Sequence, residues 1–118
     1  MGIEWVLFLF IIVFFVYRFM PVKGITNISV QEVKDKIKDH NVQFIDVRTP
    51  GEYKANHSKP FKNIPLSNLA HKAGELDKEK EVVVICQSGM RSAKAAKVLK
   101  KRGFQKIYNV RGGMSAWF

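Results

Sequence analysis

The chain has 118 residues, a length that favours one folded domain, and it carries 20 Lys or Arg against 10 Asp or Glu, a formal net charge of +10. The basic residues form no long run and are not interleaved with aromatic residues, so the charge does not predict a nucleic-acid partner. We interpret it first as a solvated surface and second as attraction to anionic lipids or substrates. The single cysteine excludes an internal disulfide and fits a reducing compartment.

The first twenty residues are the most apolar part of the chain. Thirteen consecutive apolar or aromatic residues occupy positions 5–17. Together with the apolar positions that flank them, they would form a helix of about 27 Å at ~1.5 Å per residue, near the thickness of a bilayer core. We therefore expect residues 1–20 to form a transmembrane helix, with residues 3–20 in contact with the membrane.

Two other interpretations of this segment are weaker. A cleaved signal peptide has a basic start and small residues at its cleavage site, and residues 1–4 and 17–21 offer neither. A buried core helix would present a polar face, which this run lacks. Arg18 and Lys23 follow the run, whereas no Lys or Arg precedes it. The positive-inside rule then predicts a single-pass protein of the cell membrane with its C-terminal domain in the cytoplasm.

A short linker is followed by alternating strands and helices. The proline and glycine of residues 21–24 end the first helix and predict the linker. Ser29 and Glu32 have the spacing of a capping box, which predicts a helix start. Over residues 25–118 the alternation predicts one α/β domain, a parallel sheet with helices on both faces. The expected strands are 25–29, 42–46, 63–65, 81–86 and 105–110, and the longer expected helices are 66–73 and 90–101.

Residues 86–92, Cys-Gln-Ser-Gly-Met-Arg-Ser, are the most informative segment. Cys86 follows an apolar run typical of a buried strand, and the loop after it leads into a helical pattern. The N–H groups of such a loop and the positive end of the helix dipole stabilise an anion or a thiolate. Cys86 is therefore the candidate nucleophile. The candidate substrate-binding or anion-binding loop consists of Gln87, Ser88, Gly89, Met90, Arg91 and Ser92.

Several of these residue types have a physical role at their positions. Gly89 allows the backbone to turn tightly toward the sulfur. Arg91 supplies a cation with a planar set of donors, which would bind an oxyanion or brace the loop. Ser92 is expected to cap the helix that follows and to offer a hydroxyl to the site. Asp46 and Arg48 come at the carboxyl end of another expected strand, where parallel sheets bind their ligands. We therefore expect both to lie near Cys86.

Four segments, in order, resemble the rhodanese-like family of sulfurtransferases. The resemblance covers residues 25–118 and implies a rhodanese-like parallel sheet flanked by helices on both faces, here preceded by the expected transmembrane helix. No cofactor and no metal site are expected. The matching segments are FIDVRTPGEY at 44–53, His57 with NIPL at 63–66, VICQSGMRS at 84–92 and VRGGMSAW at 110–117.

The resemblance implies transfer of sulfane sulfur. A small donor such as thiosulfate or a persulfide would give its outer sulfur to the Cys86 thiolate, and the resulting persulfide would pass it to a thiol, cyanide or a protein thiol. It also implies that Asp46 braces the active loop, and it leaves Arg48 open between substrate contact and a salt bridge. Without a second cysteine, no internal disulfide releases the sulfur, so it must leave to an outside acceptor.

Two alternative functions follow from the same segment. Four residues separate Cys86 from Arg91, whereas cysteine-dependent phosphatases, including those of this fold, have five. The shorter loop therefore favours sulfur over phosphate or arsenate. The other alternative is a catalytically silent binding or regulatory module at the membrane, but such modules usually lack the cysteine.

His57 is expected to form a structural hydrogen bond instead of acting as a base.

Overall fold

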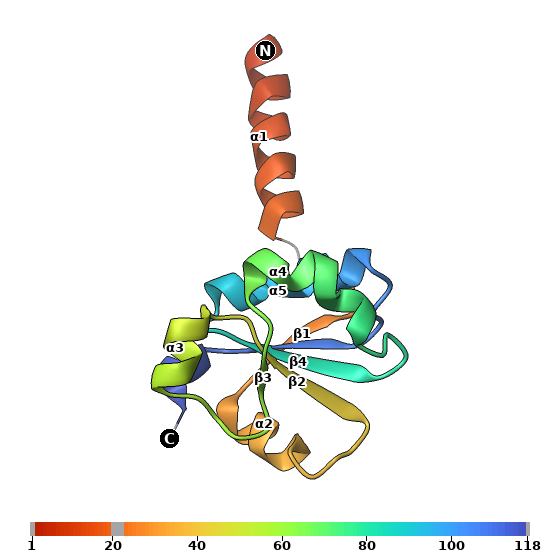
Figure 1. Ribbon diagram of the computed structural model, residues 1–118. Coiled ribbons are helices and arrows are strands. Elements are labelled where there is room, and N and C mark those ends of the chain that lie inside the picture. Colours follow the sequence, from red (N-terminus) through yellow and green to blue (C-terminus); the bar gives the residue numbers. More distant parts are fainter. Residues whose placement is uncertain (1, 20–22, 118) are drawn as a thin grey trace.

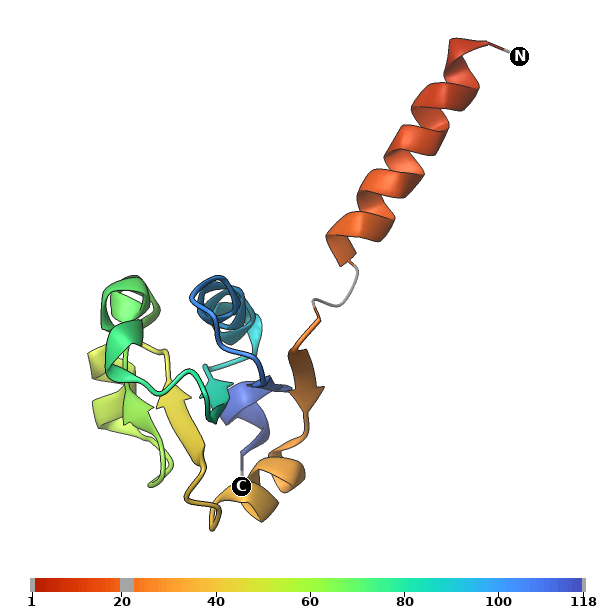
Figure 2. The same ribbon diagram turned by 90° about the vertical axis from the view of Figure 1, so that its right-hand side faces the viewer.

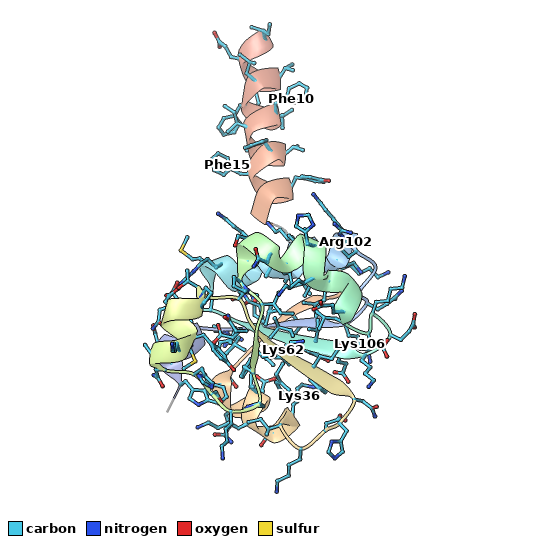
Figure 3. All side chains as sticks on the ribbon, viewed as in Figure 1. Phe10, Phe15, Lys36, Lys62, Arg102 and Lys106 are labelled. Carbon is cyan, nitrogen blue, oxygen red and sulfur yellow. The ribbon has the colours of Figure 1, made fainter. Side chains whose placement is uncertain are left out.

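The computed structural model describes residues 2–19 and 23–117. Helix α1 (Ile3–Phe19) stands apart from the α/β domain in both views of the ribbon (Figure 1, Figure 2). Its side chains from residue 3 to residue 17 are all exposed. Phe10 and Phe15 project from it well away from the sheet (Figure 3).

The predicted transmembrane helix is not confirmed. Helix α1 has 17 residues. Within residues 2–19 and 23–117, no helix combines the length and the apolar character needed to cross a membrane. The membrane location and cytoplasmic orientation depended on that helix and remain predictions.

The predicted linker lies partly outside the described residues. Residues 21 and 22 of the linker and residue 118 of the predicted domain are outside them. Gly24 is described and has a φ of +91°, and β1 begins at the next residue. A Cβ at this position would lie 2.8 Å from the carbonyl oxygen of Gln105. Both the positive φ and the close approach require glycine here.

One five-stranded parallel sheet forms the centre of the domain, as the alternating pattern predicts. Its strand order is β1-β5-β4-β2-β3, so β4 is the middle strand. In the register of the sheet, Val83 of β4 pairs with Phe44 of β2 and with Tyr108 of β5. The strands are β1 (Ile25–Ile28), β2 (Val42–Asp46), β3 (Lys62–Asn63), β4 (Glu81–Ile85) and β5 (Ile107–Val110).

Helices cover both faces of this sheet, also as predicted. Helices α4 and α5 lie side by side on one face, and α2 lies on the opposite face (Figure 1, Figure 2). Leu69 and Leu99 belong to the buried cluster under α4 and α5, and Val33 belongs to the cluster under α2. Burial of one such side chain contributes about 1.5–3 kcal/mol. The helices are α2 (Val30–Lys36), α3 (Pro50–Ala55), α4 (Leu66–Lys72) and α5 (Met90–Lys101), with 3-10 turns η1 (Ala73–Glu75) and η2 (Gly113–Ala116).

The carboxyl ends of β2 and β4 meet at one edge of the sheet. Asp46 pairs with Ile85 in the register, and the next N–H along β2, that of Val47, donates to the Ile85 carbonyl at 2.9 Å. Cys86 is the residue after Ile85. Asp46 and Cys86 thus lie close together at this edge, as predicted. Parallel sheets bind their ligands at this edge.

Two capping boxes begin the helices on either side of β2. Ser29 and Glu32 begin α2, as predicted, with each side chain bonded to the other's backbone N–H. Thr49 and Glu52 form a second box at the start of α3, with proline at its first turn. Because a capping box satisfies two free N–H groups, it fixes the position of its acidic side chain. Glu52 is therefore held firmly at the start of α3.

Several element boundaries differ by one or two residues from the predicted ones. Strand β3 contains only Lys62 and Asn63, whereas the sequence predicts residues 63–65, although the N–H groups of Ile64 and Leu66 still donate to the Asp46 and Val47 carbonyls of β2 and its extension. Strand β5 begins at residue 107, since the Phe104 N–H still bonds the C-terminal turn of α5. The 3-10 turn η2 follows β5 and is not anticipated from the sequence. Backbone N–H groups of this turn donate hydrogen bonds to the active loop.

Candidate active site

Cys86 lies directly after the central strand β4, in the middle of the sheet edge. It has an exposed fraction of 0 % and forms no disulfide. The Gly89 N–H donates a hydrogen bond to its Sγ at 2.9 Å, and the Ser92 hydroxyl lies 3.3 Å from Sγ. The loop therefore closes around the sulfur atom with donors directed at it.

Two opposing influences act on the pKa of the Cys86 thiol. Burial raises this pKa, because a charged thiolate is poorly solvated in the interior. The Ser92 hydroxyl and the backbone N–H groups of Ser92, Gly89 and Ser88 lower it, and together they outweigh burial, so the pKa lies below its ordinary value of 9.0. The thiolate is the nucleophilic form of cysteine. The loop thus increases the reactive fraction at neutral pH.

Gly89 makes the turn between the thiol and α5. Its φ is +106°, a conformation that residues with side chains rarely adopt, and it is the N-cap of the 12-residue helix α5. The prediction that Ser92 caps this helix is therefore wrong. Ser92 is the third residue of the helix and is fully buried, with its hydroxyl beside Cys86.

Ser92 belongs to a buried network that extends from the thiol to the neighbouring strands. Its Oγ lies 2.5 Å from Oδ1 of Asn109 on β5 and 3.2 Å from the Gly89 carbonyl oxygen. Asn109 in turn donates from Nδ2 to Oδ1 of Asn27 on β1 at 3.1 Å. Since a hydroxyl has one proton, Ser92 donates either to these oxygens or to the thiolate. The network therefore contains an uncharged donor next to Sγ.

Arg91, predicted to bind an anion or to brace the loop, is paired with Glu52 of α3. Its two terminal nitrogens donate to the two carboxylate oxygens at 2.6 and 2.9 Å, and the side chains are 36 % and 34 % exposed. Hydrogen bonds from Arg91 and Thr49 lower the pKa of Glu52 from 4.5 to about 2, and the same pairing raises the pKa of Arg91. The bidentate edge of the guanidinium is thus occupied by a carboxylate of the protein.

Arg48 forms a second ion pair, with Asp46, and this one is buried. Its Nη2 lies 2.9 Å from Asp46 Oδ2, and the two side chains are 3 % and 0 % exposed. Nη2 also donates to the Asn56 carbonyl at 2.5 Å, and Nη1 donates to the side-chain oxygen of Gln87 at 3.4 Å. Of the two roles considered for Arg48, the structure contains the salt bridge. Through Arg48, Asp46 reaches the active loop.

The turn η2 supports the loop through its backbone. The Met114 N–H donates to the Cys86 carbonyl at 2.8 Å, and the N–H and hydroxyl of Ser115 donate to the Gln87 carbonyl at 3.0 and 2.8 Å. A Cβ on Gly113 would clash with the Cys86 carbonyl oxygen. Glycine is therefore required for the two segments to approach this closely.

The remaining predicted residues lie at the surface. Gln87, Ser88 and Met90 are exposed. His57 Nδ1 lies 2.7 Å from the Tyr53 carbonyl oxygen, and its ring stacks on the Tyr53 ring at a centroid distance of 3.8 Å. This is the structural hydrogen bond expected of that histidine. No group of three or more His, Cys, Asp or Glu side chains within residues 2–19 and 23–117 is arranged to hold a metal ion.

Three contributors to the site are not identified from the sequence. Glu52 could have been found, because Thr49 and Glu52 have the spacing of a capping box close to the end of a strand. Asn109 interrupts an otherwise apolar strand, and a buried polar residue implies a partner. Ser115 offers no comparable signal, since its bond to Gln87 joins residues 28 positions apart.

Comparison with known proteins identifies the family. Residues 29–118 match the family described as Rhodanese-like domain. The chain belongs to the rhodanese-like family. The thiosulfate sulfurtransferase GlpE of Shewanella oneidensis is 33 % identical over 91 residues, which cover 77 % of this chain and 90 % of GlpE. The crystal structure of a rhodanese-like domain protein from Staphylococcus aureus has 32 % identity and a TM-score of 0.72, and the match covers 79 % of this chain and 91 % of that one.

Two other relatives are longer than this chain. YrkF and YqhL of Bacillus subtilis are 39 % and 43 % identical over 95 and 75 residues, which are 80 % and 64 % of this chain. The chain spans only 51 % and 60 % of the length of these two proteins. The rhodanese-like sheet predicted from the sequence is confirmed by the family match and by the structural similarity.

Proposed function

We propose that this rhodanese-like protein is a sulfurtransferase that carries sulfane sulfur as a persulfide on Cys86. The observation that carries the proposal is the position of Sγ, at the end of the central strand with the Gly89 N–H 2.9 Å away and the Ser92 hydroxyl 3.3 Å away. Such donors stabilise a thiolate before the reaction and a persulfide anion after it. The name of the relative GlpE as a thiosulfate sulfurtransferase supports the same reaction class.

The loading step is a displacement at sulfur. The Cys86 thiolate attacks the outer sulfur of the donor, the new bond joins Sγ to that sulfur, and the bond between the two donor sulfurs breaks. With thiosulfate the leaving group is sulfite, and with an organic persulfide it is a thiolate. The electron pair of the broken bond leaves with that group, so no external oxidant or reductant is needed.

The unloading step requires an acceptor outside the chain. Cys86 is the only cysteine of the sequence, so a disulfide within the chain does not release the sulfur. The outer sulfur of the persulfide instead passes to a thiol, to cyanide or to a protein thiol, and the Cys86 thiolate is regenerated. The protein would then act as a carrier between two partners.

Mass spectrometry of the intact protein tests the proposal. After treatment with thiosulfate or cysteine persulfide, we expect wild-type protein to gain the mass of one sulfur atom, and cyanide or excess thiol to remove it. Cys86→Ser should gain none and retain its fold by circular dichroism, because serine differs from cysteine by a single atom. Sulfur transfer by that variant would refute the role of Cys86.

The same measurement separates catalysis from a binding function. If the folded wild-type protein gains no sulfur from either donor, the proposed transfer is wrong and the domain is a binding or regulatory module with a sulfurtransferase fold. Alkylation of Cys86 in the same sample shows whether the thiol was reduced and able to react during the experiment.

A further inference from the structure

The cation of the active loop is neutralised by a firmly held carboxylate. Arg91 directs two nitrogens at Glu52, at 2.6 and 2.9 Å. From the other side, the N–H and the hydroxyl of Thr49 lie 3.1 and 3.0 Å from Oε1 of the same carboxylate. A carboxylate held from both sides stays in place as long as α3 is folded. Arg91 therefore meets an incoming donor as one half of an ion pair.

The second arginine beside the loop is neutralised as well. Arg48 uses Nε and Nη2 on Asp46, and its remaining nitrogen faces the uncharged amide of Gln87. These two arginines and two carboxylates have no net charge together. The groups that hold the Cys86 sulfur, the Gly89 N–H and the Ser92 hydroxyl, are also uncharged. These two ion pairs therefore add no net positive charge that could compensate a highly charged donor.

Charge separates the two classes of sulfur donor. Thiosulfate is a dianion, so its reaction with the thiolate brings three negative charges together and leaves sulfite beside a persulfide anion. An organic persulfide carries at most one negative charge at its sulfurs, so even its anion brings fewer charges to the thiolate than thiosulfate does, and its protonated form, RSSH, brings none. The thiolate bonds to its outer sulfur, the S–S bond breaks, RS⁻ leaves and the proton stays on the transferred sulfur, so one negative charge is present throughout. Repulsion between like charges is stronger in a partly buried site, which favours the persulfide.

An apolar side chain in the loop favours the same class. The side chain of Met90 is 75 % exposed. Among the described residues 23–117, it is the only large hydrophobic side chain that is exposed. It lies in the active loop between Gly89 and Arg91. A flexible thioether can pack against the carbon part of an organic donor but provides no donor for the oxygens of thiosulfate.

We propose that Glu52 is a specificity-determining residue, which by neutralising Arg91 makes organic persulfides, and not thiosulfate, the preferred sulfur donors of Cys86. This inference rests on the proposed function, because it concerns how sulfur reaches Cys86. Glu52 acts on the donor through Arg91 and needs no direct contact with it.

The substitution Glu52→Gln isolates the charge. Glutamine keeps a side-chain oxygen for the capping box of α3, because Gln also occurs at that position. It removes the negative charge that neutralises Arg91. The measured quantity is the second-order rate constant for loading one sulfur onto Cys86, followed by intact mass in single turnovers. The donors are thiosulfate and cysteine persulfide, and their ratio cancels any general change in reactivity.

We expect wild-type protein to load sulfur faster from cysteine persulfide than from thiosulfate. In Glu52→Gln the ratio of the thiosulfate rate to the persulfide rate should rise about tenfold, because the freed guanidinium attracts the dianion. Replacing Arg91 by glutamine in the Glu52→Gln background should abolish this rise. The matched control is Glu75→Gln, which removes one exposed acid from η1. Because η1 precedes β4, it lies at the opposite edge of the sheet from Cys86. The ratio of the thiosulfate rate to the persulfide rate in Glu75→Gln should therefore stay within about twofold of the wild-type value.

The outcomes distinguish this inference from the proposed function. Loading from both donors, with a ratio in Glu52→Gln within about twofold of wild type, overturns the role of Glu52 and leaves the sulfurtransferase proposal intact. Faster loading of the wild type from thiosulfate also overturns it. Failure of the wild type to load sulfur from either donor overturns the proposed function, and the donor preference with it.

Discussion

The two arginine–carboxylate pairs beside the active loop have the same chemistry and opposite surroundings. Arg48 and Asp46 are at most 3 % exposed, whereas Arg91 and Glu52 are about one-third exposed, at 36 % and 34 %. The buried pair joins residues two positions apart and continues into the Asn56 carbonyl and Gln87. The exposed pair joins the loop to a separate helix, α3. The buried pair therefore supports the structure, whereas the charges of the exposed pair can act on an approaching donor.

The difference between the buried and the exposed ion pair arises from solvation. Two charges removed from water depend on each other, and the loss of one leaves the other without compensation. Two charges at the surface are also solvated by water, so the loss of one is largely compensated. The same substitution, carboxylate to amide, should thus have a large effect on stability in one pair and a small effect in the other.

The largest expected effect is that of Asp46→Asn. It leaves the Arg48 guanidinium buried and unpaired, and we expect the free energy of unfolding to fall by about 3–5 kcal/mol. Urea unfolding monitored by circular dichroism measures the change. A loss below about 1 kcal/mol would mean that this pair behaves like a surface pair and that the contrast in burial has no energetic consequence.

A second substitution tests whether the uncharged donors or the arginines determine the pKa of the Cys86 thiol. Ser92→Ala removes the hydroxyl that lowers the pKa of Cys86, so the pKa should rise and alkylation by iodoacetamide at neutral pH should slow several-fold. The pH dependence of the alkylation rate gives the pKa directly. Ser88→Ala is the matched control, because it changes an exposed side chain of the same loop and keeps the backbone N–H. Equal profiles for wild type and Ser92→Ala would assign control of the thiol to other groups.

The smallest expected effect is that of Glu52→Gln on stability. The folded state lowers the pKa of Glu52 from 4.5 to about 2, so the pair stabilises the protein above pH 4.5 and this contribution disappears as the pH falls toward 2. Because the pair is about one-third exposed, we expect at most about 1 kcal/mol at pH 7.

Urea unfolding of wild type and Glu52→Gln at pH 7 and at pH 3 measures this contribution, and the difference between the two proteins should shrink at the lower pH. Glu81→Gln provides a matched control, since Lys36 and Glu81 form another partly exposed pair with side chains 28 % and 26 % exposed. A loss at Glu52 as large as that at Asp46 would remove the distinction between the two pairs.

The fold follows closely from the sequence because its signals are local. Apolar runs and helical spacing depend on neighbouring residues, so the order of strands and helices, the parallel sheet and the full extent of α5 are all predicted. The position of Cys86 after the central strand is predicted for the same reason. The bounds of β3 are harder to predict, because this edge strand pairs with β2 over only two residues.

The site is less predictable because its decisive contacts join distant segments. The sequence places Arg91 in the loop but does not indicate Glu52, 39 positions earlier, as its partner. It predicts a cap and a hydroxyl from Ser92, but only tertiary packing shows that this hydroxyl lies between the thiol and Asn109. Arg91 is thus held in an ion pair, and Ser92 contributes its hydroxyl to the site but does not cap α5.

The support of the active loop by η2 has a consequence for how the protein acquires reactivity during synthesis. The carbonyl groups of Cys86 and Gln87 accept hydrogen bonds from Met114 and Ser115, residues that leave the ribosome well after the cysteine itself. Domains fold as units, so the loop reaches its final geometry only when this last turn docks. The nascent chain therefore carries an ordinary thiol, and the activated one arises with the completion of the domain.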